Sequence, residues 1–138
     1  MRFDGSLVVL VTNLDEGEPS DEEACLSHLL GHRVIVDYGH TRTLGEWIKY
    51  LGADDRTGPT FDDAKAELEK HGVRFDGSEL KVANATPGIE AIYRATRWKR
   101  GAHWRVLRRL DGARAGGNAW FAGNQSKCTV IPQTLLPE

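Results

Sequence analysis

Capping and turn residues divide the second half of the chain into short elements with a definite order. Thr60 followed by Asp63 predicts the start of a helix, and Gly72 ends it, because a hydroxyl before the first turn and a glycine after the last are preferred. The Asp76-Gly77 dipeptide predicts a turn, and the alternating segment over 79–83 predicts a strand after it. This half therefore begins with a helix and a strand.

A second helix starts with Thr86 as its cap and Pro87 at its first position, where the missing N–H costs nothing, and it runs to about residue 95. The remaining elements are a turn through Lys99 and Gly101, a helix over 102–110, and strands over 118–122 and 127–131 joined by the loop 123–126. The order helix, strand, helix, helix, strand, turn, strand is that of a winged helix, a variant of the helix-turn-helix.

The first half has short α/β elements. They are a strand over 7–11, a helix over 20–30 opened by a Ser20–Glu23 capping box, a strand over 33–38 and a helix over 43–51. Residues 52–59 are charged and contain glycine and proline, which is typical of a linker. We therefore expect an α+β protein, with a small α/β segment over 1–58 preceding a winged-helix domain over 59–138.

The charge of the chain is strongly polarised. Residues 1–93 hold nine Lys and Arg against eighteen Asp and Glu, whereas 94–138 hold nine against two, so the net charges are −9 and +7. Between Arg94 and Arg114 there are eight basic residues and a single acid, with Trp98 and Trp104 among them. Clustered guanidinium groups with interleaved aromatics are the usual footprint of a nucleic-acid contact. The alternative is a solvated basic face that pairs with the acidic half.

The helix over 102–110 has two unlike faces. His103, Val106, Leu107 and Leu110 fall on one arc, and Trp104, Arg105, Arg108 and Arg109 fall on the opposite arc. In a winged helix this third helix enters the major groove, so we expect the apolar arc to face the core and the basic arc to face DNA. Arginine pairs in a forked geometry with phosphate or guanine edges, and tryptophan can stack or pack against a sugar.

The predicted partner is therefore DNA, duplex in preference to single-stranded, although the Trp residues would allow single strands. Arg97, Lys99 and Arg100 lie in the turn before the basic helix, and Gln125 and Lys127 at the expected wing tip. The residues expected to contact DNA are Arg97, Lys99, Arg100, Trp104, Arg105, Arg108, Arg109, Arg114, Gln125 and Lys127.

Two other sets of residues suggest metal chemistry. Glu79-Leu-Lys81, with Asp63 or Asp76 upstream, has the acid-x-lysine pattern of metal-dependent nucleases, in which carboxylates hold a divalent ion and the lysine helps to position water. The spacing of Cys25, His28, His32 and His40 could form a zinc site, although Cys25 occupies a position where a core residue is expected. A third alternative is a protein-interaction module whose basic face docks an acidic partner.

The first half also resembles a known family. Ser6–Asn13 is similar to the sensor strand of superfamily-3 helicases, and Asp15–Pro19 and Arg33–Val36 resemble the acidic loop and following strand. Phage and plasmid primase-helicases of this type often end in a winged helix, which Thr60–Ile131 resembles. The resemblance implies a sensor role for Asn13, an arginine-finger role for Arg33, and a place in DNA replication or regulation. No G-x-x-x-x-G-K-[ST] loop is present, so the chain cannot hydrolyse ATP by that mechanism alone.

Composition narrows the remaining classes. The apolar run over 7–11 is too short to cross a bilayer and follows an acid, so neither a membrane span nor a signal peptide is expected. Two cysteines do not make a disulfide framework, which favours a reduced, cytoplasmic setting. The sequence favours a binding protein without cofactor or metal over an enzyme, and it allows a larger replication complex or a homo-oligomer.

Overall fold

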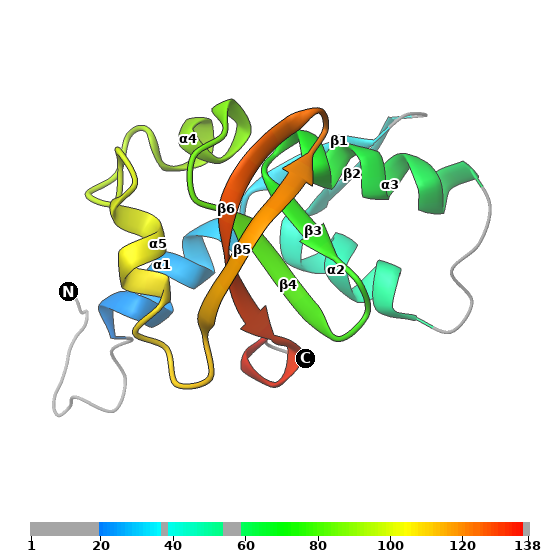
Figure 1. Cartoon of the computed structure of the whole chain (residues 1–138). Coiled ribbons are helices and arrows are strands. Elements are labelled where there is room, and N and C mark those ends of the chain that lie inside the picture. Colours follow the sequence, from blue (N-terminus) through cyan, green and yellow to red (C-terminus); the bar gives the residue numbers. More distant parts are fainter. Residues whose placement is uncertain (1–19, 37–38, 54–58, 137–138) are drawn as a thin grey trace, which may run out of the picture.

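The computed structural model describes residues 20–36, 39–53 and 59–136 and shows a mixed α+β fold (Figure 1). The predicted strand over 7–11, the sensor position Asn13 and most of the predicted linker lie outside the described residues.

The first half forms two helices and a small hairpin. Helix α1 (Asp21–Leu30) opens with the predicted capping box, in which Ser20 and Glu23 exchange side-chain-to-backbone hydrogen bonds. Strand β1 (Arg33–Val36) pairs antiparallel with β2 (His40–Thr43), which the sequence pattern did not predict. Helix α2 (Leu44–Gly52) begins with Thr43 in a second capping box, as expected for a helix over 43–51.

The second half contains the predicted helices and strands in the predicted order, with a strand (β3) and a 3-10 turn (η4) that were not predicted. The elements are α3 (Pro59–Lys70), β3 (Val73–Phe75), β4 (Glu79–Ala83), α4 (Pro87–Tyr93), α5 (Ala102–Leu107), β5 (Arg114–Phe121), β6 (Asn124–Pro132) and η4 (Gln133–Leu135). Thr86 caps α4 as predicted, whereas Thr60 lies inside α3 and does not cap it. Helix α5 is three residues shorter than predicted.

Four of these strands form one antiparallel sheet with the order β3-β4-β6-β5. The last two strands are longer than predicted and meet at a two-residue turn, Ala122-Gly123, in which both φ angles are positive (53° and 88°). This is the geometry of the tight turn that matches the twist of a hairpin. Figure 1 shows α4 and α5 on one side of the β5–β6 hairpin and α2 and α3 on the other.

Residues from both halves of the chain build a single core. Cys25 and Trp47 from the first half are buried in the same apolar cluster as Leu68, Tyr93 and Ile131 from the second. The Tyr93 hydroxyl donates to the Cys25 carbonyl at 2.8 Å, which ties α4 to α1. The domain boundary after residue 58 stays a prediction, and the described residues on its two sides share this core.

Helices α3 and α4 approach each other closely at Gly88. A Cβ atom at this position would overlap the Lys70 carbonyl oxygen and lie 2.8 Å from the His71 Cα atom. Glycine is therefore required where the first turn of α4 crosses the end of α3. This contact fixes the start of α4 against the end of α3.

Among the described residues, no helix combines the length and the apolar character needed to cross a membrane.

Candidate nucleic-acid interface

Helix α5 is held to the core by the arc that the sequence predicts to be buried. Val106 and Leu107 are buried, and Leu110 packs against the core just beyond the helix. The buried His103 ring stacks on Tyr93 with 4.8 Å between ring centroids, and its Nε2 donates to the Ala83 carbonyl at 2.9 Å. Burial lowers the pKa of His103, so the neutral imidazole fills this place. The inward arc of the sequence prediction is confirmed.

The outward arc of α5 carries a half-buried tryptophan flanked by two arginines. The guanidinium carbons of Arg105 and Arg108 lie 5.1 and 4.4 Å from the centroid of the Trp104 ring. Arg108 also reaches strand β6, where its Nε donates to Thr129 Oγ1 at 3.2 Å and its Nη2 to the Cys128 carbonyl at 3.4 Å. Arg105 is exposed and stacks only on the indole. Arg108 is therefore fixed in place, whereas Arg105 is free to reach a ligand.

Two exposed cations precede this helix. Lys99 and Arg100 lie in the turn after α4, and Arg100 adopts a left-handed backbone with φ of 58°. Within the described residues neither side chain forms an ion pair. The next residue, Gly101, is also left-handed and begins α5 against the edge of the Trp104 indole. The turn therefore places two unneutralised cations beside Trp104.

The β5–β6 hairpin exposes one of its faces beside α5. Asn118 pairs with Lys127 and Trp120 with Gln125, so these four side chains lie on one face, and Ala119 and Phe121 are buried on the other. Trp120 is 55% exposed, which is unusual for so large an apolar side chain. Gln125 and Lys127 were predicted at the wing tip, and this is wrong. The tip is Ala122-Gly123, because the strands continue to a two-residue turn.

Arg108 joins the helix to this hairpin face. Its hydrogen-bond partner Thr129 lies two residues from Lys127, on the same face of β6. Arg108 therefore ties the end of α5 to the strand that carries Gln125 and Lys127. We call the exposed and half-buried residues of the turn, of α5 and of this hairpin face the α5–wing band, and it consists of Lys99, Arg100, Trp104, Arg105, Arg108, Trp120, Gln125 and Lys127.

Three arginines that the sequence placed in the interface lie outside this band. Arg97 pairs with Asp21 at the start of α1 at 2.8 Å and covers the Trp98 ring, and Arg114 pairs with Glu79 of β4 at 2.8 Å. The Arg97 hydrogen bond lowers the pKa of Asp21, and the charge of Arg109 lowers it further. Acids therefore pair with Arg97 and Arg114, whereas Arg109 is exposed and forms no ion pair in the described part of the chain. The contact of all three with DNA stays a prediction.

Sequence reasoning missed one residue of the band, Trp120, and two residues beside it, Asn84 and Arg94. Trp120 was placed in a strand, but the face of the strand on which it lies was not predicted. Its position between Ala119 and Phe121, which are buried, indicates that it points outward. Asn84 and Arg94 line a pocket with Trp104. Arg94 belongs to the basic stretch but was not among the residues expected to contact DNA, and no local sequence signal marks Asn84.

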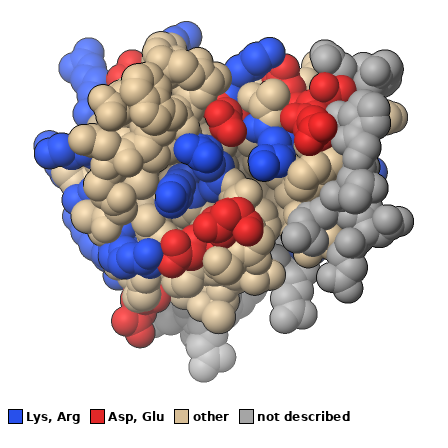
Figure 2. Space-filling model, turned by 45° about the vertical axis from the view of Figure 1, so that its right-hand side comes forward, with Lys and Arg blue, Asp and Glu red and all other residues tan. Residues whose placement is uncertain are grey.

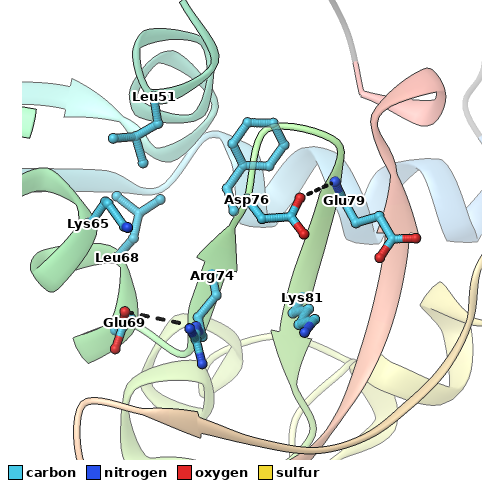
Figure 3. Close-up of a pocket in the computed structure, with 9 residues that line it drawn as sticks. Leu51, Lys65, Leu68, Glu69, Arg74, Asp76, Glu79 and Lys81 are labelled. Atoms are coloured by element: carbon cyan, nitrogen blue, oxygen red, sulfur yellow. Dashed lines mark hydrogen bonds and ion pairs between the residues drawn. The ribbon is translucent and has the colours of Figure 1, made fainter. Parts of the chain in front are cut away.

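The residues of the nuclease alternative do share a pocket. Asp76, Glu79 and Lys81 line it together with Glu69 and Arg74 (Figure 3). The carboxylates are engaged elsewhere, since Asp76 accepts hydrogen bonds from the backbone N–H groups of Ser78 and Glu79, and Glu79 pairs with Arg114. In the described part of the chain no three His, Cys, Asp or Glu side chains are grouped as metal ligands. The pocket gives no support to metal-dependent cleavage.

The residues of the zinc alternative do not converge. Cys25 is fully buried and faces the His103 carbonyl, as expected of a core residue. The Nε2 of His28 lies 2.9 Å from the Ile92 carbonyl, and the ring of His32 packs against that of His71.

Arg33, which the helicase resemblance gives as an arginine finger, lies at the exposed start of β1.

Charge on the molecular surface is mixed locally. Figure 2 shows basic and acidic side chains next to each other across the middle of the face that it presents. The overall basic charge of residues 94–138 is therefore a poor guide to an interface, and the arginines and lysines without an acidic neighbour are more informative.

Comparisons with known protein families, with curated proteins and with solved structures find no match. Function must therefore be inferred from the chemistry of the site itself.

Proposed function

We propose that this protein binds duplex DNA through the α5–wing band, with α5 as the recognition helix of a winged helix and β5–β6 as its wing. The observation that carries the proposal is the band itself, in which cations that have no acidic partner among the described residues stand beside Trp104 and continue onto the hairpin through Arg108. Arginine guanidinium groups, both fixed and free, donate strong hydrogen bonds to phosphate oxygens.

The topology supports the same proposal. In a winged helix the strand before the two helices pairs with the last strand, and the last two strands form the wing. Here β4 precedes α4 and α5, and the sheet order β4-β6-β5 reproduces these pairings. This chain adds β3 at the edge of the sheet and packs α1 against α5. Arg105 and Arg109 of the outward arc remain exposed beside these additions.

The residues of the band would have distinct roles. Arg105 extends to solvent and can reach a base edge or a phosphate. Arg108 is held by Thr129, so its charge is positioned before DNA arrives. Lys127 on the hairpin would contact the backbone of the adjacent turn, as wing residues do. The resemblance to superfamily-3 primase-helicases favours a cytoplasmic role in phage- or plasmid-type replication or regulation, within a larger assembly or a homo-oligomer.

A binding titration tests the proposal. A fluorescein-labelled duplex of about two helical turns is titrated with the full chain at about 50 and about 200 mM salt, the range over which six to ten phosphate contacts cost ~10³–10⁵ in affinity. The expected result is tight binding at low salt that weakens steeply as salt rises. A polyglutamate peptide is then added at the same concentration of charge. If it displaces the duplex as readily as unlabelled DNA does, an acidic protein partner is supported and the proposal is overturned.

A further inference from the structure

A polar pocket opens beside Trp104 at one end of the α5–wing band. Its volume is about 650 Å³, which lies within the ~300–1,000 Å³ typical of small-molecule sites. Asn84 lies just after β4, Glu90 and Arg94 lie on or at the end of α4, and Lys99 and Arg100 lie in the following turn. Consecutive elements, all within residues 84–104, therefore line one opening.

Cations outnumber acids around this opening. Arg94, Lys99 and Arg100 are exposed, and their side chains form no ion pair within the described residues. Glu90 is the single acid among the residues that line the pocket. The neighbouring Arg97, by contrast, is paired with Asp21. Three cations with one acid between them are suited to an anion such as a phosphate.

The wall of the pocket offers recognition groups of a different kind. Asn84 is 9% exposed, and its Oδ1 accepts a hydrogen bond from Thr129 Oγ1 at 3.1 Å. Its Nδ2 has no acceptor among the described residues, although buried polar groups normally have a partner. Beside it stands the half-buried Trp104 ring, which lines the pocket and lies within cation–π distance of Arg105 and Arg108. An amide donor next to an aromatic ring is suited to a nucleobase.

We propose that this pocket holds one unpaired nucleotide of a DNA strand. The phosphate would lie at the rim formed by Arg94, Lys99 and Arg100, and the base would stack on Trp104 and accept a hydrogen bond from Asn84. A base within a duplex enters such a pocket only when it is flipped out, at a cost of a few kcal/mol, so an unpaired base at an end, a gap or a junction is the favoured ligand. This inference rests on the proposed function and narrows its ligand to a duplex that continues as a single strand.

The experiment compares a blunt duplex with the same duplex carrying one unpaired nucleotide at its 3′ or its 5′ end. The unpaired nucleotide is 2-aminopurine, whose fluorescence is quenched on stacking. At least one overhang is expected to bind about tenfold more tightly than the blunt duplex, the effect of one stacked base, with quenching. Equal affinities for all three duplexes without quenching would overturn the pocket proposal and leave the proposed function intact. Absence of binding to any duplex would overturn the proposed function itself.

Arg94→Gln gives the sharpest variant, because Arg94 lines the pocket but does not belong to the band. It is expected to abolish the overhang preference and the quenching while blunt-duplex affinity stays within about twofold, as one peripheral charge allows. Arg114→Gln removes the same charge outside the pocket and should keep the preference. An overhang preference that survives Arg94→Gln with unchanged quenching would contradict the assignment.

A free nucleotide has the same chemistry as the nucleotide of a strand, and a competition experiment distinguishes them. Millimolar dAMP is expected to leave the 2-aminopurine of the overhang quenched. The free nucleotide gains no affinity from the band, whereas the overhang is held by the duplex to which it belongs. Displacement of the overhang by dAMP, with no loss of blunt-duplex binding, would show a site for free nucleotides and overturn the assignment to a strand.

Discussion

Arg108 covers the indole of Trp104 and at the same time donates to Thr129 on strand β6, with its guanidinium carbon 4.4 Å from the ring centroid and its Nε 3.2 Å from the threonine hydroxyl. One side chain thus connects the end of α5 to the hairpin beside it. Lysine could not make this connection, because its single ammonium lacks the flat, forked donor set.

Arg108→Ala should therefore weaken both folding and DNA binding. The loss of a stacked cation and of hydrogen bonds to β6 is expected to lower the free energy of unfolding by about 1–2 kcal/mol. Arg108→Lys keeps the charge and should recover part of the DNA affinity but little of the stability. Urea unfolding of the three proteins measures the first effect, and duplex titration measures the second. Full stability in Arg108→Lys would show that charge alone accounts for the contact.

The buried His103 predicts a pH dependence of stability. Burial lowers its pKa in the folded state below the ordinary value of 6.5, so the unfolded chain binds the proton more readily. Stability is therefore complete above about pH 6.5 and falls as the pH drops below it. His32, whose pKa burial and His71 also lower, acts in the same direction.

His103→Gln should flatten this dependence. Glutamine keeps an amide donor for the Ala83 carbonyl but does not titrate, so only the contribution of His32 should remain between pH 5 and 6.5. Thermal unfolding at several pH values provides the measurement. An unchanged pH profile in the variant would mean that His103 titrates normally in the folded protein.

Gly88→Ala is expected to destabilise the fold by about 3 kcal/mol, at the upper end of overpacking costs, because the new Cβ would meet backbone atoms of Lys70 and His71 that cannot move aside. Gly45 offers a matched control. It holds the same second position in α2 that Gly88 holds in α4, and a Cβ there would meet Leu30 at an ordinary 3.4 Å. Gly45→Ala should be neutral or stabilising by up to about 1 kcal/mol. Equal urea midpoints for the two variants would contradict this account of the α3–α4 contact.

Local signals account for the part of the fold that the sequence predicted. The Ser20–Glu23 capping box, the Thr86-Pro87 helix start and the two faces of α5 each depend on residues within a few positions of one another. Strand β2 was missed because His40–Thr43 is polar and largely exposed, so its conformation comes from pairing with β1 and not from its own pattern. The first half of β5, which includes Gly116 and Gly117, was missed for the same reason.

The interface was predicted less well, because the sequence does not show which acid will pair with a given arginine in the folded protein. Arg97 and its acid Asp21 are 76 positions apart, and Arg114 and Glu79 are also brought together by the fold. Only the fold therefore separates Arg97 and Arg114, which pair with a remote acid, from the cations of this stretch that form no ion pair among the described residues.

This division provides the most direct test of the central claim, since two triple variants remove the same charge from different places. One replaces Lys99, Arg100 and Arg105 of the band by Gln, and the other replaces Arg97, Arg109 and Arg114. Duplex affinity is measured by anisotropy across a salt series, with circular dichroism to confirm folding. The band variant should lose about 100-fold in affinity and about three units of salt slope, near 0.9 for each phosphate contact, whereas the other variant should stay within about threefold. Equal losses in the two variants would contradict the α5–wing band as the DNA-binding surface.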